Sequence, residues 1–96
     1  MYRIIDGRGT GKTGRLLLLA KENNGAIVCA NPERMRERAH SYGITGIACV
    51  NYTTYINFIM GHGNLPLVGK KIFIDEIDTF LSVFADNIQG YTLSLD

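Results

Sequence analysis

The sequence predicts a three-layer α/β/α fold built on a mostly parallel sheet of about five strands. Short apolar segments alternate with helical segments along the chain, which is typical of a parallel sheet with helices on both faces. Two apolar segments, Ile27–Asn31 and Ile47–Asn51, end alike, in a cysteine, one further residue and an asparagine that can open a helix. This repeat indicates two parallel strands that end at the same edge of the sheet. With 96 residues, the chain is expected to form a single minimal domain over residues 1–96.

The first strand is expected at Tyr2–Asp6, and it runs into a glycine-rich loop that ends in Gly-Lys-Thr. Glycines allow a backbone to wrap a polyphosphate with its N–H groups turned inward. Lys12 is expected to reach the β- and γ-phosphates, and the Thr13 hydroxyl to hold Mg²⁺. The residues expected to surround the phosphates are Gly7, Arg8, Gly9, Thr10, Gly11, Lys12, Thr13 and Gly14. The full motif has a glycine where this chain has Asp6, and the alternative is a glycine-rich turn with an exposed lysine.

A helix is expected over Lys12–Asn23, where a run of leucines is apolar nearly all round and favours deep packing on a sheet. The positive end of its dipole adds to the same anion site. After a strand at Ala26–Ala30, a second helix is expected between a capping asparagine, Asn31, and Gly43. The core face of this helix is predicted to be Met35, Ala39 and Tyr42.

Three arginines, Arg34, Arg36 and Arg38, lie outside that core face and alternate with two glutamates. Such charges are typical of a solvated helix face with local ion pairs. The alternative for these arginines is a contact with nucleic acid.

The second half of the chain continues the alternation of strands and helices. A helix is expected over Tyr52–Met60, with Tyr52, Tyr55, Ile56 and Ile59 on its inner face. A glycine-rich loop then leads to a continuous apolar strand at Lys71–Asp75. Asp78 is expected to cap the next helix, whose apolar residues are Ile77, Phe80, Leu81, Phe84 and Ile88. The last strand is expected at Tyr91–Leu95.

Two carboxylates follow the strand at Lys71–Asp75. Ligands of parallel sheets bind at the carboxyl ends of the strands, so Asp75 and Glu76 are expected at the edge where the glycine-rich loop lies. Asp75 is predicted to hold Mg²⁺ together with Thr13, and Glu76 to orient or activate a water molecule. The alternative is an acidic surface turn that caps the following helix.

With these two motifs, the chain resembles the P-loop NTPases. The loop is similar to their Walker A motif, and the segment IFIDEID is similar to their Walker B motif. Glu76 after Asp75 resembles the branch with a catalytic glutamate, which includes helicases and viral DNA-packaging ATPases. The residues that match lie at 7–13 and 72–78.

The resemblance also implies roles for residues outside the two motifs. In that branch, the strand after the acidic motif carries a polar sensor residue, and Ser94, or Thr92, matches this role by position. Arg8 is similar in position to a loop arginine with which packaging ATPases stabilise charge in cis. The catalytic set implied by the resemblance is therefore Glu76, Lys12, Arg8 and Ser94.

The function implied by the resemblance is Mg²⁺-dependent binding of a nucleoside triphosphate, ATP or GTP, with slow hydrolysis inside a nucleic-acid-related or viral assembly. An arginine from a second copy or from a partner protein would accelerate this hydrolysis. The alternative is a non-enzymatic interaction or inhibitor module, derived from a P-loop ATPase and encoded by a virus, that regulates a nucleic-acid machine. The shortness of the chain and Asp6 favour this alternative.

Composition sets the remaining expectations. The net charge is +1, and residues 1–40 carry eight lysines and arginines against four acidic residues, a basic half that suits a polyphosphate ligand. Cys29 and Cys49 are expected to be buried, reduced thiols. No signal peptide or membrane-spanning run is expected, which favours the cytoplasm, or the host cytoplasm for a viral protein.

Overall fold

The described residues of the chain form four helices and three strands in a computed structural model. The structure describes residues 3–5, 11–61, 67, 69–85, 87–90 and 92. The elements follow in the order α1 (Lys12–Glu22), β1 (Gly25–Cys29), α2 (Pro32–Ser41), β2 (Ala48–Asn51), α3 (Tyr52–Ile59), β3 (Lys71–Ile74) and α4 (Ile77–Phe84). Helices and strands therefore alternate from α1 onward, as the sequence predicts.

The three strands form one parallel sheet in the order β2-β1-β3. In the central strand, Ile27 lies opposite Cys49 of β2 and opposite Phe73 of β3. The two segments with a cysteine and an asparagine thus belong to neighbouring parallel strands, which confirms the prediction drawn from their repeat.

The described sheet is smaller than the sheet of about five strands that the sequence predicts. Residues 3–5, from the predicted strand Tyr2–Asp6, belong to no strand of the described structure, and neither does Thr92, from Tyr91–Leu95. The other residues of these two predicted strands lie outside the described residues.

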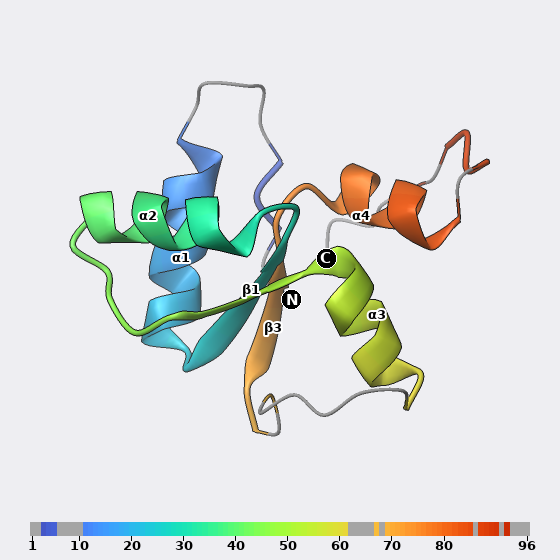
Figure 1. Cartoon of the computed structure of the whole chain (residues 1–96). Helices are drawn as coiled ribbons and strands as arrows, with labels where there is room; N and C mark the ends of the chain where they lie inside the picture. Colours follow the sequence, from blue (N-terminus) through green and yellow to red (C-terminus); the bar gives the residue numbers. More distant parts are fainter. Residues whose placement is uncertain are drawn as a thin grey trace.

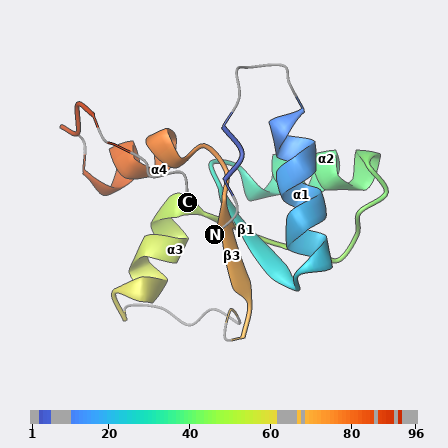
Figure 2. The ribbon, with the colours of Figure 1, turned by 180° about the vertical axis from the view of Figure 1, so that it is seen from behind.

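Helices cover both faces of the sheet. Helices α1 and α2 lie on one side of the strands, and α3 and α4 lie on the other (Figures 1 and 2). Side chains of β1 alternate between two cores, because successive residues of a strand point to opposite faces. The core under α1 and α2 contains Leu17, Ala20, Ile27, Cys29, Met35, Ala39, Ile47, Cys49 and Phe73. The core under α3 and α4 contains Val28, Tyr52 and Phe80. The described structure is therefore a three-layer α/β/α arrangement.

Two asparagines start the helices that follow β1 and β2. The Asn31 side chain accepts a hydrogen bond from the Arg34 N–H at 3.1 Å, and the Asn51 side chain accepts one from the Thr54 N–H at 2.7 Å. Each satisfies a backbone donor of the first turn that has no partner inside the helix. The predicted capping role of both asparagines is confirmed.

The predicted core residues divide according to their place in the helices. Residues in the middle of helices, such as Met35, Ala39 and Phe80, are buried. The exceptions are Leu18, Tyr42, Ile59, Ile77, Phe84 and Ile88, which are exposed, so the leucine run of α1 is not buried all round as predicted. Leu18 lies on the outer side of α1, and the other five lie at or beyond the end of a helix, where the apolar stripe continues but the described sheet no longer covers it. Cys29 and Cys49 are free and buried, as predicted.

Candidate functional site

The predicted phosphate site lies at the edge of the sheet where the strands end. Helix α1 begins at the end of the sheet where β1 and β3 finish (Figure 1). Parallel strands all end at this edge, so the segment after β3 and the first turn of α1 come together. The described residues of the site are therefore Gly11 to Gly14 and the pair Asp75 and Glu76.

Gly11 sets the start of α1. Its φ angle is 77°, in the left-handed region that glycine adopts without the strain of a side chain. As the residue before the helix, it offers no side-chain acceptor to the N–H groups of the first turn, and that turn contains no acidic residue. A helix start of this kind suits an anion, because the N–H groups and the helix dipole attract negative charge.

The first turn of α1 contacts the carboxylate that follows β3. The Thr13 side chain is a hydrogen-bond partner of the Asp75 carboxyl group. Burial raises the pKa of Asp75 above its ordinary value of 3.8, and the negative charge of Glu76 raises this pKa further. The positive charges of Arg38 and Lys12, and the hydrogen bond from Thr13, act in the opposite direction and lower it. Asp75 is thus a partly buried carboxylate surrounded by charges of both signs.

Lys12 and Glu76 form an ion pair across the site. The Lys12 Nζ and Glu76 Oε1 atoms are 3.5 Å apart, and the two side chains are 26% and 43% exposed. An ion pair this exposed contributes little to stability, on the order of 0 to 1 kcal/mol. The pair therefore contributes little to the stability of the fold, but it shows that the Lys12 and Glu76 side chains lie close together.

Glu76 has an unusual backbone conformation. Its φ and ψ angles are 57° and 71°, in the left-handed region, and the helix α4 begins directly after it. A residue with a β-carbon is strained in this region by about 1–2 kcal/mol. Strained residues of this kind often cluster at functional sites, where the surrounding structure holds them in place.

The predicted helix cap at Asp78 is wrong. Helix α4 starts at Ile77, so Asp78 lies in its first turn, and Glu76 precedes the helix without a side-chain cap. The Glu76 carbonyl accepts the first helical hydrogen bond, from the Phe80 N–H at 3.0 Å. The helical hydrogen bonds thus begin at the Glu76 carbonyl, two residues before the predicted cap.

The backbone of Asp75 is held on both sides. Its N–H donates to the Val28 carbonyl at 2.9 Å, and its carbonyl accepts from the Tyr52 hydroxyl at 2.6 Å. Burial raises the pKa of Tyr52 above its usual value, and the negative charge of Asp75 adds to this shift, so the hydroxyl keeps its proton and remains a donor. The Tyr52 hydroxyl therefore reaches Asp75 from α3, which lies on the other face of the sheet from α1.

The interactions of Tyr52 and Arg38 with Asp75 could not be predicted from the sequence. Tyr52 is predicted as a core residue, and it is buried, but nothing in the sequence links its hydroxyl to Asp75. Arg38 is predicted to lie on a solvated face, and it is exposed, yet its charge acts on Asp75. Arg36 also has a partner inside the fold, because its Nη1 donates to the Cys49 carbonyl at 3.4 Å. Both kinds of contact depend on how α2 and α3 cross the sheet.

The remaining predicted site residues lie outside the described residues. They are Gly7, Arg8, Gly9, Thr10 and Ser94. Within the described part of the chain, Gly11, Lys12, Thr13, Gly14, Asp75 and Glu76 have the positions given above. Among those described residues, no group of three or more His, Cys, Asp or Glu side chains could hold a metal ion by itself.

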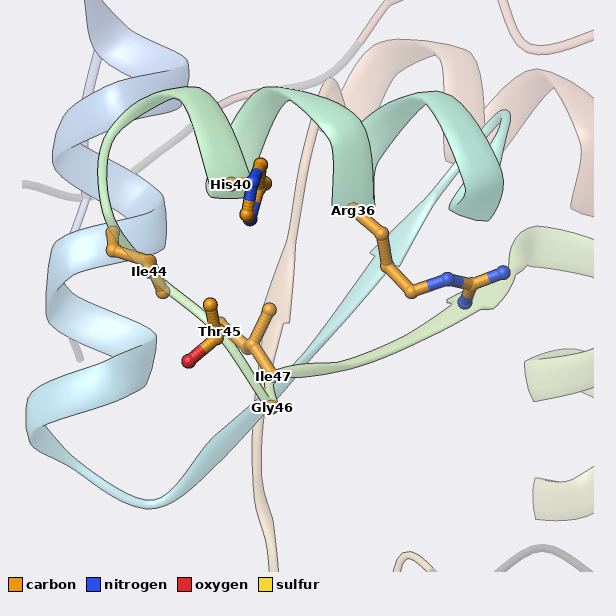
Figure 3. Close-up of a pocket in the computed structure, with 6 residues that line it drawn as sticks. All are labelled: Arg36, His40, Ile44, Thr45, Gly46 and Ile47. Carbon is orange, nitrogen blue, oxygen red and sulfur yellow. The ribbon is translucent and has the colours of Figure 1, made fainter.

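A separate hollow of about 220 Å³ lies under α2, away from these residues (Figure 3). It is lined by Arg36, His40, Ile44, Thr45, Gly46 and Ile47. The Arg36 guanidinium points away from His40, toward β2 (Figure 3). The hollow contains none of the predicted site residues.

Among the helices that the structure describes, none has the length and apolar character that crossing a membrane requires. Comparisons with protein-family models, with curated proteins and with solved structures gave no match.

Proposed function

We propose that this protein binds a nucleoside triphosphate with Mg²⁺ at the carboxyl edge of its sheet and hydrolyses it slowly, with ATP as the first candidate and GTP as the second. The observation that carries the proposal is the meeting of the first turn of α1 with the end of β3, where Lys12 Nζ lies 3.5 Å from Glu76 Oε1 and the Thr13 side chain lowers the pKa of Asp75. It brings together two oxygen ligands from the two segments that resemble the Walker A and Walker B motifs. A chance glycine-rich turn with an exposed lysine would not require this contact.

The donor set suits Mg²⁺. A hydroxyl and a carboxylate are hard oxygen ligands, and Mg²⁺ usually takes only one or two protein ligands and leaves its other positions to water and phosphates. Bound Mg²⁺ would offset the negative charge of the phosphate oxygens. Thr13 and Asp75 would hold it.

Lys12 and Glu76 would then exchange partners. In the free protein the Lys12 ammonium lies 3.5 Å from Glu76. A triphosphate offers Lys12 a more negative partner, and Glu76 is released toward the γ-phosphate. Glu76 would take a proton from a water molecule as the water oxygen bonds to the γ-phosphorus and the bond to the β–γ bridging oxygen breaks.

The residues outside the described part keep the roles that the sequence implies. Gly7, Gly9 and Thr10 would complete the backbone cradle. Arg8 would offset charge on the phosphates from within the loop, and Ser94 would contact the γ-phosphate region as a polar sensor.

A second copy of the chain or a partner protein would supply the arginine that accelerates hydrolysis. Exposed apolar residues on and after α4, among them Val83, Phe84 and Ile88, agree with such an interaction. This part of the proposal predicts that the rate of phosphate release per chain rises with protein concentration.

The test measures thermal unfolding with Mg·ATP and Mg·GTP, and phosphate release, for the wild type, Lys12→Ala and Glu76→Gln. A nucleotide at about 100 times its Kd adds about 2.7 kcal/mol of stability, which raises the Tm of so small a domain by about 10 °C or more. Lys12→Ala should abolish this shift. Glu76→Gln should keep the shift and lose phosphate release.

The matched control is Lys71→Ala. Lys71 is an exposed lysine at the opposite end of β3, so its removal changes the net charge equally without touching the site. The absence of any shift in the wild type would reject nucleotide binding. A shift that remains without turnover, and that Glu76→Gln does not alter, would favour the interaction module that holds a nucleotide without hydrolysing it.

A further inference from the structure

The backbone of Asp75 is held by contacts from two other elements, one on each of the peptides that flank its Cα atom. On one side, the Asp75 N–H donates to Val28 of the central strand at 2.9 Å. On the other side, the Tyr52 hydroxyl donates to the Asp75 carbonyl at 2.6 Å. The second contact is short for a hydrogen bond of this type, in which the donor and acceptor oxygens are about 2.7–2.8 Å apart.

Tyr52 is itself held rigidly. It is the first residue of α3, directly after the capping Asn51 at the end of β2. Its side chain is 4% exposed, and its ring packs edge-on against the Phe80 ring of α4, with centroids 5.6 Å apart. The Tyr52 hydroxyl can therefore hold the Asp75 carbonyl, directly after β3, in one position.

The Asp75 carbonyl belongs to the same peptide plane as the Glu76 N–H. Because that plane is rigid, fixing the carbonyl restricts the rotation on both sides of it. One rotation is the ψ angle of Asp75, which sets how its Cβ atom lies relative to this plane. The other is the φ angle of Glu76, which lies in the strained left-handed region at 57°. Strain of this kind persists only where the surroundings hold it.

We propose that Tyr52 is a positioning residue for the Asp75–Glu76 pair: its hydroxyl holds their shared peptide so that Asp75 meets Mg²⁺ and Glu76 keeps its left-handed conformation. The inference rests on the proposed function, since it assigns a role within that site. Tyr52 touches neither metal nor nucleotide in this role and acts only through the Asp75 backbone.

The test compares Tyr52→Phe with Tyr55→Phe. Tyr52→Phe removes one hydroxyl and leaves the ring against Phe80. Tyr55 lies on the same helix, its ring also packs near Phe80 with centroids 6.3 Å apart, and its hydroxyl makes no hydrogen bond to a described residue. The two variants therefore differ in the contact to Asp75 and not in the chemistry of the change.

The first measurement is amide hydrogen exchange in the nucleotide-free protein, which does not depend on the proposed function. Tyr52→Phe should speed exchange at the Asp75 and Phe80 amides by about fivefold to tenfold, because one hydrogen bond that holds the turn is lost. The Met35 amide, which donates to Asn31 at the start of α2, should be unchanged. Tyr55→Phe should change none of the three amides.

The second measurement separates positioning from general stability. With EDTA, the nucleotide affinity of Tyr52→Phe should stay within about twofold of the wild type, since Lys12 and the loop bind the phosphates. The Mg²⁺ concentration for half-maximal nucleotide binding should rise about tenfold, and phosphate release should fall by a similar factor. A residue that only stabilised the fold would not split these two affinities.

The outcomes distinguish the two proposals. If the wild type binds no nucleotide, the proposed function fails, and the positioning role for Mg²⁺ binding fails with it. Faster exchange of the Asp75 and Phe80 amides in Tyr52→Phe would then show only that Tyr52 stabilises the turn. If the wild type binds Mg·ATP and the two tyrosine variants behave alike in either measurement, the inference about Tyr52 is wrong and the proposed function stands.

Discussion

At the scale of single residues, Asp75 is the group of the candidate site whose pKa is subject to several opposing influences. Burial and the Glu76 charge raise its pKa, while Arg38, Lys12 and the Thr13 hydroxyl lower it. The net shift is upward, so the ionised carboxylate is less stable in the fold than in water. A site that binds a cation gains from such a carboxylate, because the cation relieves a charge that the fold alone does not fully satisfy.

Asp75→Asn should therefore make the nucleotide-free protein more stable at neutral pH and remove the Mg²⁺-dependent part of nucleotide binding. The folded protein holds the Asp75 proton more tightly than the unfolded chain, whose carboxyl has a pKa near 3.8. Ionisation consequently reduces wild-type stability as the pH rises through the folded pKa, and this loss is absent below the unfolded pKa. The advantage of the variant should thus be largest near neutrality and should vanish in acid.

Urea unfolding between about pH 3 and pH 8 measures this difference. Asp78→Asn is the control, because Asp78 is an exposed acid in the first turn of α4 that stabilises the helix dipole. It should lose a few tenths of a kcal/mol where Asp75→Asn gains stability. An Asp75→Asn variant that is less stable than the wild type at pH 7 would show that the contacts with Thr13 and Arg38 outweigh the burial.

At the scale of elements, the turn between β3 and α4 is the segment that departs most from local preference. A glutamate stands in a left-handed conformation, and the helix begins without a side-chain cap. By contrast, α2 and α3 begin with asparagine caps that local chemistry favours. The turn before α4 is therefore less stable locally than the starts of α2 and α3, and it places two carboxylates beside the start of α1.

Glu76→Gly should stabilise the protein by about 1 kcal/mol, because glycine adopts the left-handed conformation without strain. Glu76→Gln keeps the β-carbon and loses the same charge, so it should not gain this stability. Both should lose phosphate release. Urea unfolding of the two variants checks the prediction, which would be contradicted if Glu76→Gly were no more stable than Glu76→Gln.

At the scale of the whole molecule, one thin sheet carries two hydrophobic cores. Ile27 packs under α1 and α2, and its neighbour Val28 packs under α3 and α4, and both are completely buried. Since adjacent residues of β1 serve opposite cores, neither core can open without disturbing the strand that supports the other. The described structure should therefore unfold as one cooperative unit.

Ile27→Ala and Val28→Ala test this coupling. Ile27→Ala should lower the free energy of unfolding by about 2–4 kcal/mol, and Val28→Ala by somewhat less because fewer methylene groups are lost. In each variant, far-ultraviolet circular dichroism and tyrosine absorbance should report the same midpoint. Two separate transitions after either change would show that the cores are independent.

Most of the elements could be predicted from the sequence, because their signals are short-range. The helices α1, α2 and α3 and the strands β1 and β3 lie within one or two residues of their predicted ranges. The caps at Asn31 and Asn51 follow from hydrogen bonds that span three residues. The exposed ends of the helices, such as Tyr42 and Phe84, could not be predicted, because an apolar stripe does not show where the sheet beneath it stops.

The types of residue at the candidate site likewise follow from the sequence alone. A lysine and a threonine opening a helix, and an Asp-Glu pair closing an apolar strand, are local patterns that point to phosphate and Mg²⁺ chemistry. Their meeting comes only from packing: the Thr13 contact with Asp75, the Tyr52 hydroxyl on the Asp75 carbonyl and the left-handed Glu76 all depend on segments distant in the chain. Such contacts arise where parallel strands end at one edge, and neither periodicity nor propensity reaches across that distance.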